Sequence, residues 1–70
     1  MRAREVERRI RRAGGQLVRQ VGSHRRWRVS GNGVTASTAV PQHPGDIPDG
    51  TLGKIERDLA PVLGRGWLKP

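Results

Sequence analysis

Apolar residues recur at steps of three and four in two separate stretches of the chain, a spacing typical of amphipathic helices. The first stretch carries Ala3, Val6, Ile10 and Ala13. The second stretch carries Leu52, Ile55, Leu59 and Val62. We therefore expect one helix over residues 3–13, which the glycines at 14–15 stop, and a second over residues 50–60, which Pro61 ends or kinks.

Between these stretches the pattern changes to that of β-strands. Residues 16–21, 24–29 and 34–40 are strand-like segments, and the sequence SGNG at 30–33 is a strong turn signal between the last two. Alternation divides the middle segment between two faces, with His24, Arg26 and Arg28 on one and Arg25, Trp27 and Val29 on the other. The second face is expected to meet the core, with Arg25 near an edge or reaching water.

The order of these elements is α-β-β-β-α, which predicts an α+β fold. We expect a three-stranded antiparallel sheet with both helices on one face. A chain of 70 residues accommodates one small domain, because a second core is hard to stabilise at this length. The core of this single domain, 1–70, is expected within about 3–60, and 61–70 form a C-terminal tail. In the tail, Trp67 is equally suited to packing back and to contacting a partner.

The basic residues are concentrated near the start of the chain. The sequence holds 14 Lys and Arg against 6 Asp and Glu, a formal net charge of +8. Residues 1–30 contain ten arginines and two glutamates, so the whole excess lies there. Because the planar arginine fork suits phosphate oxygens, this distribution favours a nucleic-acid binder over a face that is charged only for solubility.

Several kinds of chemistry lack the residues that they need. The absence of cysteine excludes disulfides, thiolate nucleophiles and cysteine-based zinc sites. Two histidines are too few for an all-histidine metal site, and there is no phosphate-binding glycine loop with its lysine. No apolar stretch is long enough to span a membrane or serve as a signal peptide. We therefore expect a cytoplasmic domain that uses no metal and no cofactor.

The segment that remains for chemistry surrounds His24. Histidine ordinarily titrates near neutral pH, so it can accept a proton from an RNA 2′-hydroxyl. Arg26 and Arg28, on the same face, can bind the scissile phosphate and stabilise the charge of the transition state. The alternative is that His24 is one more polar residue of a basic sheet face, and spacing alone favours this alternative.

The neighbours of His24 also have two interpretations each. Gly22 either makes a simple turn or, without a side chain, lets an RNA backbone approach His24. Ser23 either satisfies the turn, which we favour, or binds a phosphate. Trp27 alternates away from His24, which favours a place in the core over a base-stacking role.

The second histidine, His43, could in principle be another acid or base. If Val29 pairs with Val34 across the turn, His24 lies opposite Ala39. His43 would then be about 13 Å further along the strand direction. This separation favours a structural role for His43 in the proline-rich loop.

Two motifs, in order and on the expected elements, resemble a known family. One is the helix end Ala13-Gly14 followed by VRQVGSH at 18–24 and an aromatic residue at Trp27. The other is VPQHPGDIP at 40–48, followed by Gly50-Thr51-Leu52 at the start of the second helix. Over about residues 3–59 the chain resembles the HicA-type mRNA interferase toxins of bacterial toxin–antitoxin pairs.

This resemblance implies a fold like that of double-stranded-RNA-binding domains. It implies cleavage of mRNA without a metal and without the ribosome, with His24 as the catalytic residue. It also implies a HicB-type antitoxin as the partner that covers the site. Together with the charge pattern, it predicts RNA contacts by Gly22, Ser23, Arg26, Arg28, Arg19, Arg8 and Arg12.

Two other functions stay open at this point. A non-catalytic RNA-binding module on the same fold explains the arginines without a role for His24. A DNA-binding domain is disfavoured, because the apolar stripe of the 3–13 helix must face the sheet and the 50–60 helix is nearly neutral.

Two glycines depart from the family pattern. Gly15 stands where a large apolar residue is usual, so we expect it to thin the core. Gly53 replaces a usually basic residue and weakens the second helix by up to about 1 kcal/mol relative to alanine. Both departures are expected to lower stability in the absence of the antitoxin. The tail from Pro61 onward has no counterpart in the family pattern.

Overall fold

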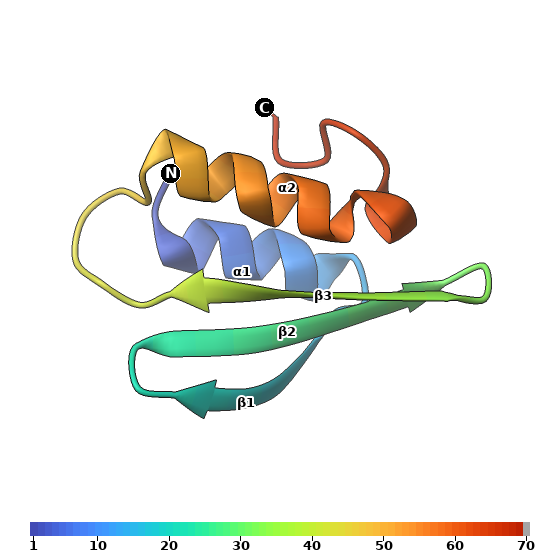
Figure 1. Cartoon of the computed structure of the whole chain (residues 1–70), viewed down its shortest axis with the longest axis horizontal. Helices are drawn as coiled ribbons and strands as arrows, with labels where there is room; N and C mark the ends of the chain where they lie inside the picture. Colours follow the sequence, from blue (N-terminus) through green and yellow to red (C-terminus); the bar gives the residue numbers. More distant parts are fainter. Residues whose placement is uncertain (70) are drawn as a thin grey trace.

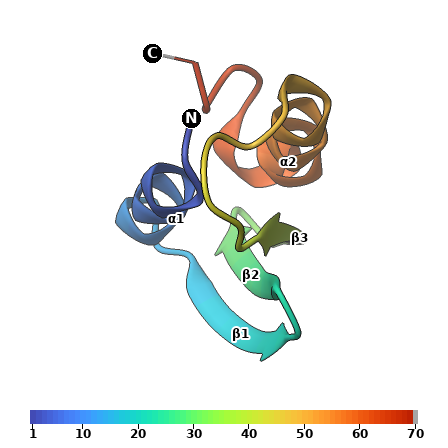
Figure 2. The ribbon, with the colours of Figure 1, turned by 90° about the vertical axis from the view of Figure 1, so that its left-hand side faces the viewer.

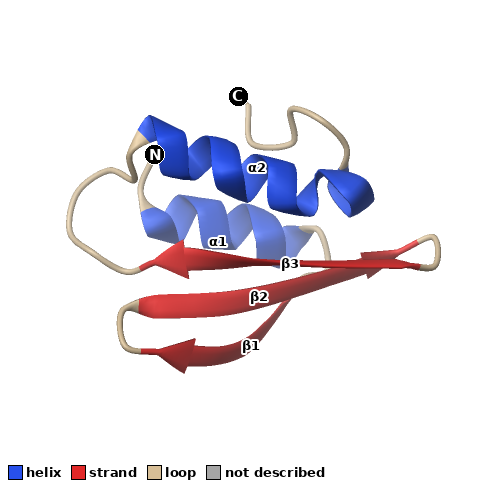
Figure 3. Ribbon diagram, viewed as in Figure 1, coloured by secondary structure: helices blue, strands red, loops and turns tan. Residues whose placement is uncertain are grey.

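The structure, a computed structural model that describes residues 1–69, confirms the expected order of elements (Figure 1). The elements are α1 (Ala3–Arg12), β1 (Gln16–Val21), β2 (His24–Gly31), β3 (Val34–Pro41) and α2 (Asp49–Leu63). The strands form one antiparallel sheet in the order β1-β2-β3. Both helices lie against the same face of this sheet, and no element covers the other face within residues 1–69 (Figures 2 and 3). In the described part of the chain, neither helix is both long and apolar enough to cross a membrane.

Two tight turns connect the strands. Gly22 and Ser23 join β1 to β2, and Gly22 has a φ of +59°, which suits glycine at the first position of a two-residue hairpin turn. Asn32 and Gly33 join β2 to β3, and both have positive φ values, as the type I′ preference for Asn-Gly requires. The predicted turn at 30–33 is therefore confirmed, in a tighter form.

This tighter turn changes the register that the sequence predicted. Val29 pairs with Ala36, and His24 pairs with Pro41. The predicted pairing of Val29 with Val34, and so of His24 with Ala39, is wrong by two residues. The cause is that Asn32-Gly33 alone makes the turn, so that both strands extend closer to it.

The core lies between the sheet and the two helices. Trp27 and Val29 are buried, as the alternation of β2 predicted. The buried apolar residues are Ala3, Val6, Ile10, Trp27, Val29, Val40, Ile47, Ile55, Leu59 and Leu68. Ala13, expected in the first apolar stripe, is exposed because α1 already ends at Arg12.

Helix α2 continues beyond Pro61, which was expected to end or kink it. Pro61 lies inside the helix, which runs to Leu63. A proline there costs one backbone hydrogen bond. Val62 and Leu63, directly after it, pack against the core and offset this cost. The apolar contacts of the last turn therefore decide where the helix ends.

The C-terminal tail packs back onto both helices. Leu68 is buried, and Trp67 is half-buried against the core. The Trp67 indole N–H donates a hydrogen bond to the Glu56 carbonyl oxygen at 2.9 Å. The Arg9 guanidinium donates to the Leu68 carbonyl oxygen at 2.6 Å. The sequence left two roles open for Trp67, packing and partner contact, and in the structure Trp67 packs against the core.

Gly15 does not thin the core as expected, because the space for a side chain is already filled. A Cβ atom at this position would lie 2.4 Å from Ile10 Cγ2 and 2.8 Å from the Ile10 carbonyl oxygen. The Gly15 N–H donates to the same carbonyl oxygen at 2.8 Å. The close approach of this strand start to the end of α1 therefore requires glycine.

We expect Gly15→Ala to lower the free energy of unfolding by about 1–3 kcal/mol, as overpacking does. Gly53→Ala is the matched control, since a Cβ there meets only the flexible end of Arg57 at 3.4 Å. That variant should gain up to about 1 kcal/mol from helix propensity. Urea denaturation of both variants measures the difference, and a Gly15→Ala protein as stable as wild type would contradict the packing argument.

Asp58 connects α2 to β3 through a hydrogen bond from Thr38. Its carboxylate accepts hydrogen bonds from the buried Thr38 hydroxyl at 3.0 Å and from Lys54 at 2.8 Å. Burial opposes ionisation, but these hydrogen bonds outweigh it and lower the pKa of Asp58 below its ordinary value of 3.8. Ionised Asp58 therefore stabilises the fold.

Because the pKa of Asp58 is lowered on folding, its contribution is complete above pH 3.8 and is lost as the pH falls through the lower folded value. We expect Asp58→Asn to have a lower urea midpoint than wild type at neutral pH. The two midpoints should converge in acid, well below pH 3.8. A difference that is constant with pH would show that the charge of Asp58 does not matter.

Candidate active site

The uncovered face of the sheet carries the histidine that the sequence singled out. His24 is the first residue of β2, and its side chain is exposed. Arg26 and Arg28 follow at alternate positions and are exposed on the same face, whereas Trp27 and Val29 between and beyond them are buried. The predicted division of β2 into two faces is confirmed.

Strand β1 adds a third arginine to this face. Arg19 pairs directly with Arg26, because an irregularity between Leu17 and Arg19 inserts one extra residue, Val18, into β1. Without this bulge, Arg19 would stand opposite Arg25 instead. Bulges of this kind redirect side chains. We call His24, Arg19, Arg26 and Arg28 the sheet-face site.

The sheet-face site has an unbalanced positive charge. Within residues 1–69, no ion pair involves Arg19, Arg26 or Arg28. Like charges directly opposite each other on neighbouring strands destabilise a sheet. An anion bound between Arg19 and Arg26 would remove this repulsion, so the arrangement suits a phosphate group.

The immediate surroundings of His24 are open and largely apolar. Val21 faces it on β1, and Pro41 faces it on β3. A Cβ atom at Gly22 would meet nothing within 4 Å, so the turn before His24 leaves space for a ligand. The Ser23 carbonyl oxygen accepts a hydrogen bond from the Gln42 N–H, which extends the strand pairing by one step beyond Pro41.

His43 lies closer to His24 than the sequence suggested. It follows Pro41, the partner of His24, by two residues rather than the four that the predicted register implied, and it lies in the loop directly after β3. Its side chain is exposed, and Nδ1 lies 3.3 Å from the Pro44 carbonyl oxygen. Both histidines are therefore at the same end of the sheet.

Two predicted RNA contacts, Arg8 and Arg12, are separated from His24. Both belong to α1, which lies on the opposite side of the sheet from the sheet-face site (Figure 2). There they line a groove of about 460 Å³, which we call the α1 groove. Its lining residues are Arg4, Glu7, Arg8, Arg11, Arg12 and Arg25. The predicted RNA contacts thus form two groups, one on each side of the sheet.

Glu7, at the base of this groove, was not recognised in the sequence. It is only 8% exposed, and its carboxylate accepts a hydrogen bond from the Trp27 indole N–H at 2.7 Å. The same oxygen lies 3.2 Å from Nε of Arg25. Arg25 is therefore paired with Glu7 on the inner face, whereas the sequence predicted that it lies near an edge or reaches water. One sequence signal could have indicated that Glu7 is buried, namely its position directly after Val6, a residue of the apolar stripe.

Two guanidinium groups also stack on the buried tryptophan. The guanidinium carbon of Arg11 lies 5.0 Å from the centre of the Trp27 ring, and that of Arg25 lies 6.0 Å from it. Cations over an indole face are attracted by its quadrupole. Trp27, Glu7, Arg11 and Arg25 therefore form one connected cluster that joins α1 to β2.

The chain matches a known protein family. A family model described as HicA toxin of bacterial toxin-antitoxin matches residues 3–60, most of the chain. The match includes the whole sheet-face site and the α1 groove, and it ends inside α2. No curated protein and no solved structure matches the chain.

Proposed function

Because this chain belongs to the HicA family, the toxins of bacterial toxin–antitoxin pairs, we propose that it is an endoribonuclease that cleaves mRNA without a metal and without the ribosome. One observation carries the proposal. It is an exposed histidine, His24, on an uncovered sheet face beside three arginines that have no ion pair within residues 1–69. The proposed substrate places the activity in the cytoplasm.

In the proposed reaction, the neutral imidazole of His24 accepts the proton of an RNA 2′-hydroxyl. The 2′-oxygen attacks the adjacent phosphorus, and the bond from phosphorus to the 5′-oxygen breaks. Arg26 and Arg28 bind the non-bridging phosphate oxygens, on which negative charge increases in the transition state. The leaving 5′-oxygen takes up a proton, and His43, at the same end of the sheet, is the candidate donor.

Gly22 and Ser23 contribute to this site through the turn that they form. The open space at Gly22 admits the RNA backbone next to His24. The Ser23 hydroxyl is available for a phosphate oxygen, since its side chain is exposed.

A HicB-type antitoxin is the proposed partner. In this proposal it neutralises the toxin by covering the sheet-face site. The uncovered face and the positive charge of the three arginines suit an acidic partner surface, because complementary charges accelerate and orient association.

The second candidate function is a non-catalytic RNA-binding module. The sheet-face arginines and the α1 groove favour it, since they account for binding to a polyanion without any role for His24. The two functions differ in whether RNA is cut.

The test of the proposed function is to incubate the purified protein with a long single-stranded mRNA in excess EDTA and to follow chain length on a denaturing gel. We expect cleavage that persists in EDTA. Binding that weakens with salt, without cleavage in any buffer, would instead identify the RNA-binding module.

A further inference from the structure

The α1 groove has no part in the chemistry proposed at His24, although arginine predominates in its lining. Five guanidinium groups and one carboxylate line it. The carboxylate, that of Glu7, is already bound by Trp27 and Arg25. Arg8 is paired outside the groove with Glu5. The groove therefore has a large excess of positive charge.

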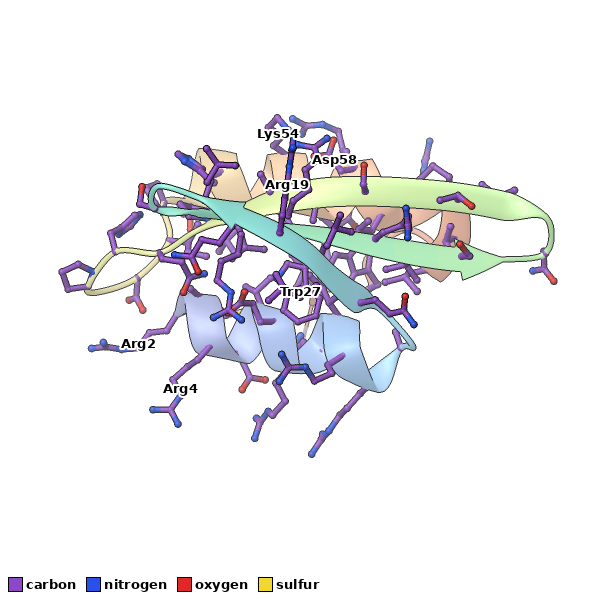
Figure 4. All side chains as sticks on the ribbon, turned by 90° about the horizontal axis from the view of Figure 1, so that it is seen from below. Arg2, Arg4, Arg19, Trp27, Lys54 and Asp58 are labelled. Atoms are coloured by element: carbon purple, nitrogen blue, oxygen red, sulfur yellow. The ribbon has the colours of Figure 1, made fainter. Side chains whose placement is uncertain are left out.

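The arginines of the groove form a stripe along one side of α1. Arg4, Arg8 and Arg11 are spaced by four and three residues, so they share one side of the helix and span about 10 Å. Figure 4 shows Arg4 projecting from this helix away from the sheet. Within residues 1–69, no ion pair involves Arg4, Arg11 or Arg12. Aligned cations of this kind, of which only Arg8 has a counter-charge within residues 1–69, match a chain of phosphates better than a single small anion.

The groove begins at the end of the sheet where His24 lies. Arg25, which follows His24 in β2, is turned to the inner face and lines the groove. The start of α1 and the turn between β1 and β2 lie at the same end of the molecule (Figure 1). An RNA strand that leaves the sheet-face site at this end therefore reaches the Arg4 end of the groove.

We propose that the α1 groove is a second phosphate-binding site for the RNA strand whose cleavage we assign to His24. The strand passes around the end of the sheet, and its flanking phosphates lie along Arg4, Arg8, Arg11 and Arg12. This inference rests on the proposed function and extends its substrate class to unpaired RNA segments longer than the sheet-face site alone can hold.

The test uses an arginine pair that makes no ion pair within residues 1–69. The double variant Arg4→Gln/Arg12→Gln removes two groove charges and leaves the ion pairs of Glu5 and Glu7 in place. The matched control is Arg57→Gln/Arg65→Gln, the same change of charge at α2 and the tail. The ligand is 2′-O-methyl RNA, which cannot be cleaved through its 2′-oxygen, in lengths of about 5 and about 16 nucleotides.

We expect the groove variant to bind the longer RNA about tenfold more weakly near physiological salt. The slope of log K against log salt should fall by about 1.4, or about 0.7 for each of the two phosphates that the variant no longer binds. Affinity for the shorter RNA should not change, and the control variant should bind both lengths like wild type. Fluorescence anisotropy across a salt series gives both quantities.

An equal reduction of affinity for both lengths of RNA would overturn the proposal, because the groove would then act only through the overall electrostatic potential of the protein. An unchanged affinity for the longer RNA would also overturn it. If the Arg4→Gln/Arg12→Gln variant bound the longer RNA like wild type but its RNA cleavage were no longer inhibited by the antitoxin, the groove would be an interface for the antitoxin. Failure of the proposed function is distinguishable from these outcomes. It would appear as an absence of cleavage in the mRNA assay, whereas the binding measurements use uncleavable RNA and do not depend on cleavage.

Discussion

Replacing His24 with alanine is expected to reduce RNA cleavage by about 10²–10⁴-fold, the usual contribution of one positioned acid or base. Fold and RNA binding should survive. In the described part of the chain, the His24 side chain makes no hydrogen bond and no ion pair, and it is exposed, so its removal costs no packing. Arg19, Arg26 and Arg28 keep their places on the face.

The measurement compares wild type with His24→Ala on a long single-stranded mRNA in excess EDTA. His43→Ala is the matched variant, since it removes the other exposed histidine at the same end of the sheet. Equal cleavage by wild type and His24→Ala would show that the site assignment is wrong, or that another nuclease is present. A loss of cleavage in His43→Ala as well would identify the donor of the second proton.

Replacing Glu7 with alanine is expected to be the most destabilising change of a charged residue in α1, at about 2–4 kcal/mol. The variant leaves the Trp27 N–H without its acceptor, inside the core. It also leaves Arg25 on the inner face without its counter-charge. The indole N–H is then buried without an acceptor, and the buried Nε of the partly exposed Arg25 has no carboxylate beside it.

Urea denaturation of three variants separates these two contributions. Glu7→Gln keeps an oxygen that accepts the Trp27 N–H but does not neutralise Arg25, so we expect an intermediate stability. Glu5→Ala is the matched control, with the same change of charge at ion pairs on the exposed side of α1, and its loss of stability should be small. If Glu7→Ala were as stable as Glu5→Ala, the buried cluster would contribute nothing to stability.

The elements and their faces could be predicted because each depends on local periodicity. The three-four spacing located both helices, and the alternation of β2 separated Trp27 from His24. The exact pairing could not be predicted, because it depends on how many residues the turn uses. Asn32-Gly33 makes a two-residue turn within a four-residue turn signal, and this places His24 opposite Pro41 rather than Ala39.

Other features depend on contacts between distant segments, which a local pattern does not contain. The continuation of α2 through Pro61 follows from the burial of the residues around it. The need for glycine at position 15 follows from its approach to Ile10. The side of the sheet on which Arg8 and Arg12 lie, in contrast, follows from local patterns, since both helices were expected on the face of Trp27 and Val29, opposite His24.

The bulge in β1 affects the exposed edge of the sheet as well as the direction of the Arg19 side chain. Strand β1 is an edge of the sheet, and it exposes Leu17 (40%), Val18 (46%) and Val21 (64%). A straight edge strand of this composition is a template for pairing with another copy and for aggregation. The extra residue at Val18 interrupts the row of backbone groups that a second strand would need. The bulge therefore protects this edge of the sheet from pairing with a second copy of the chain.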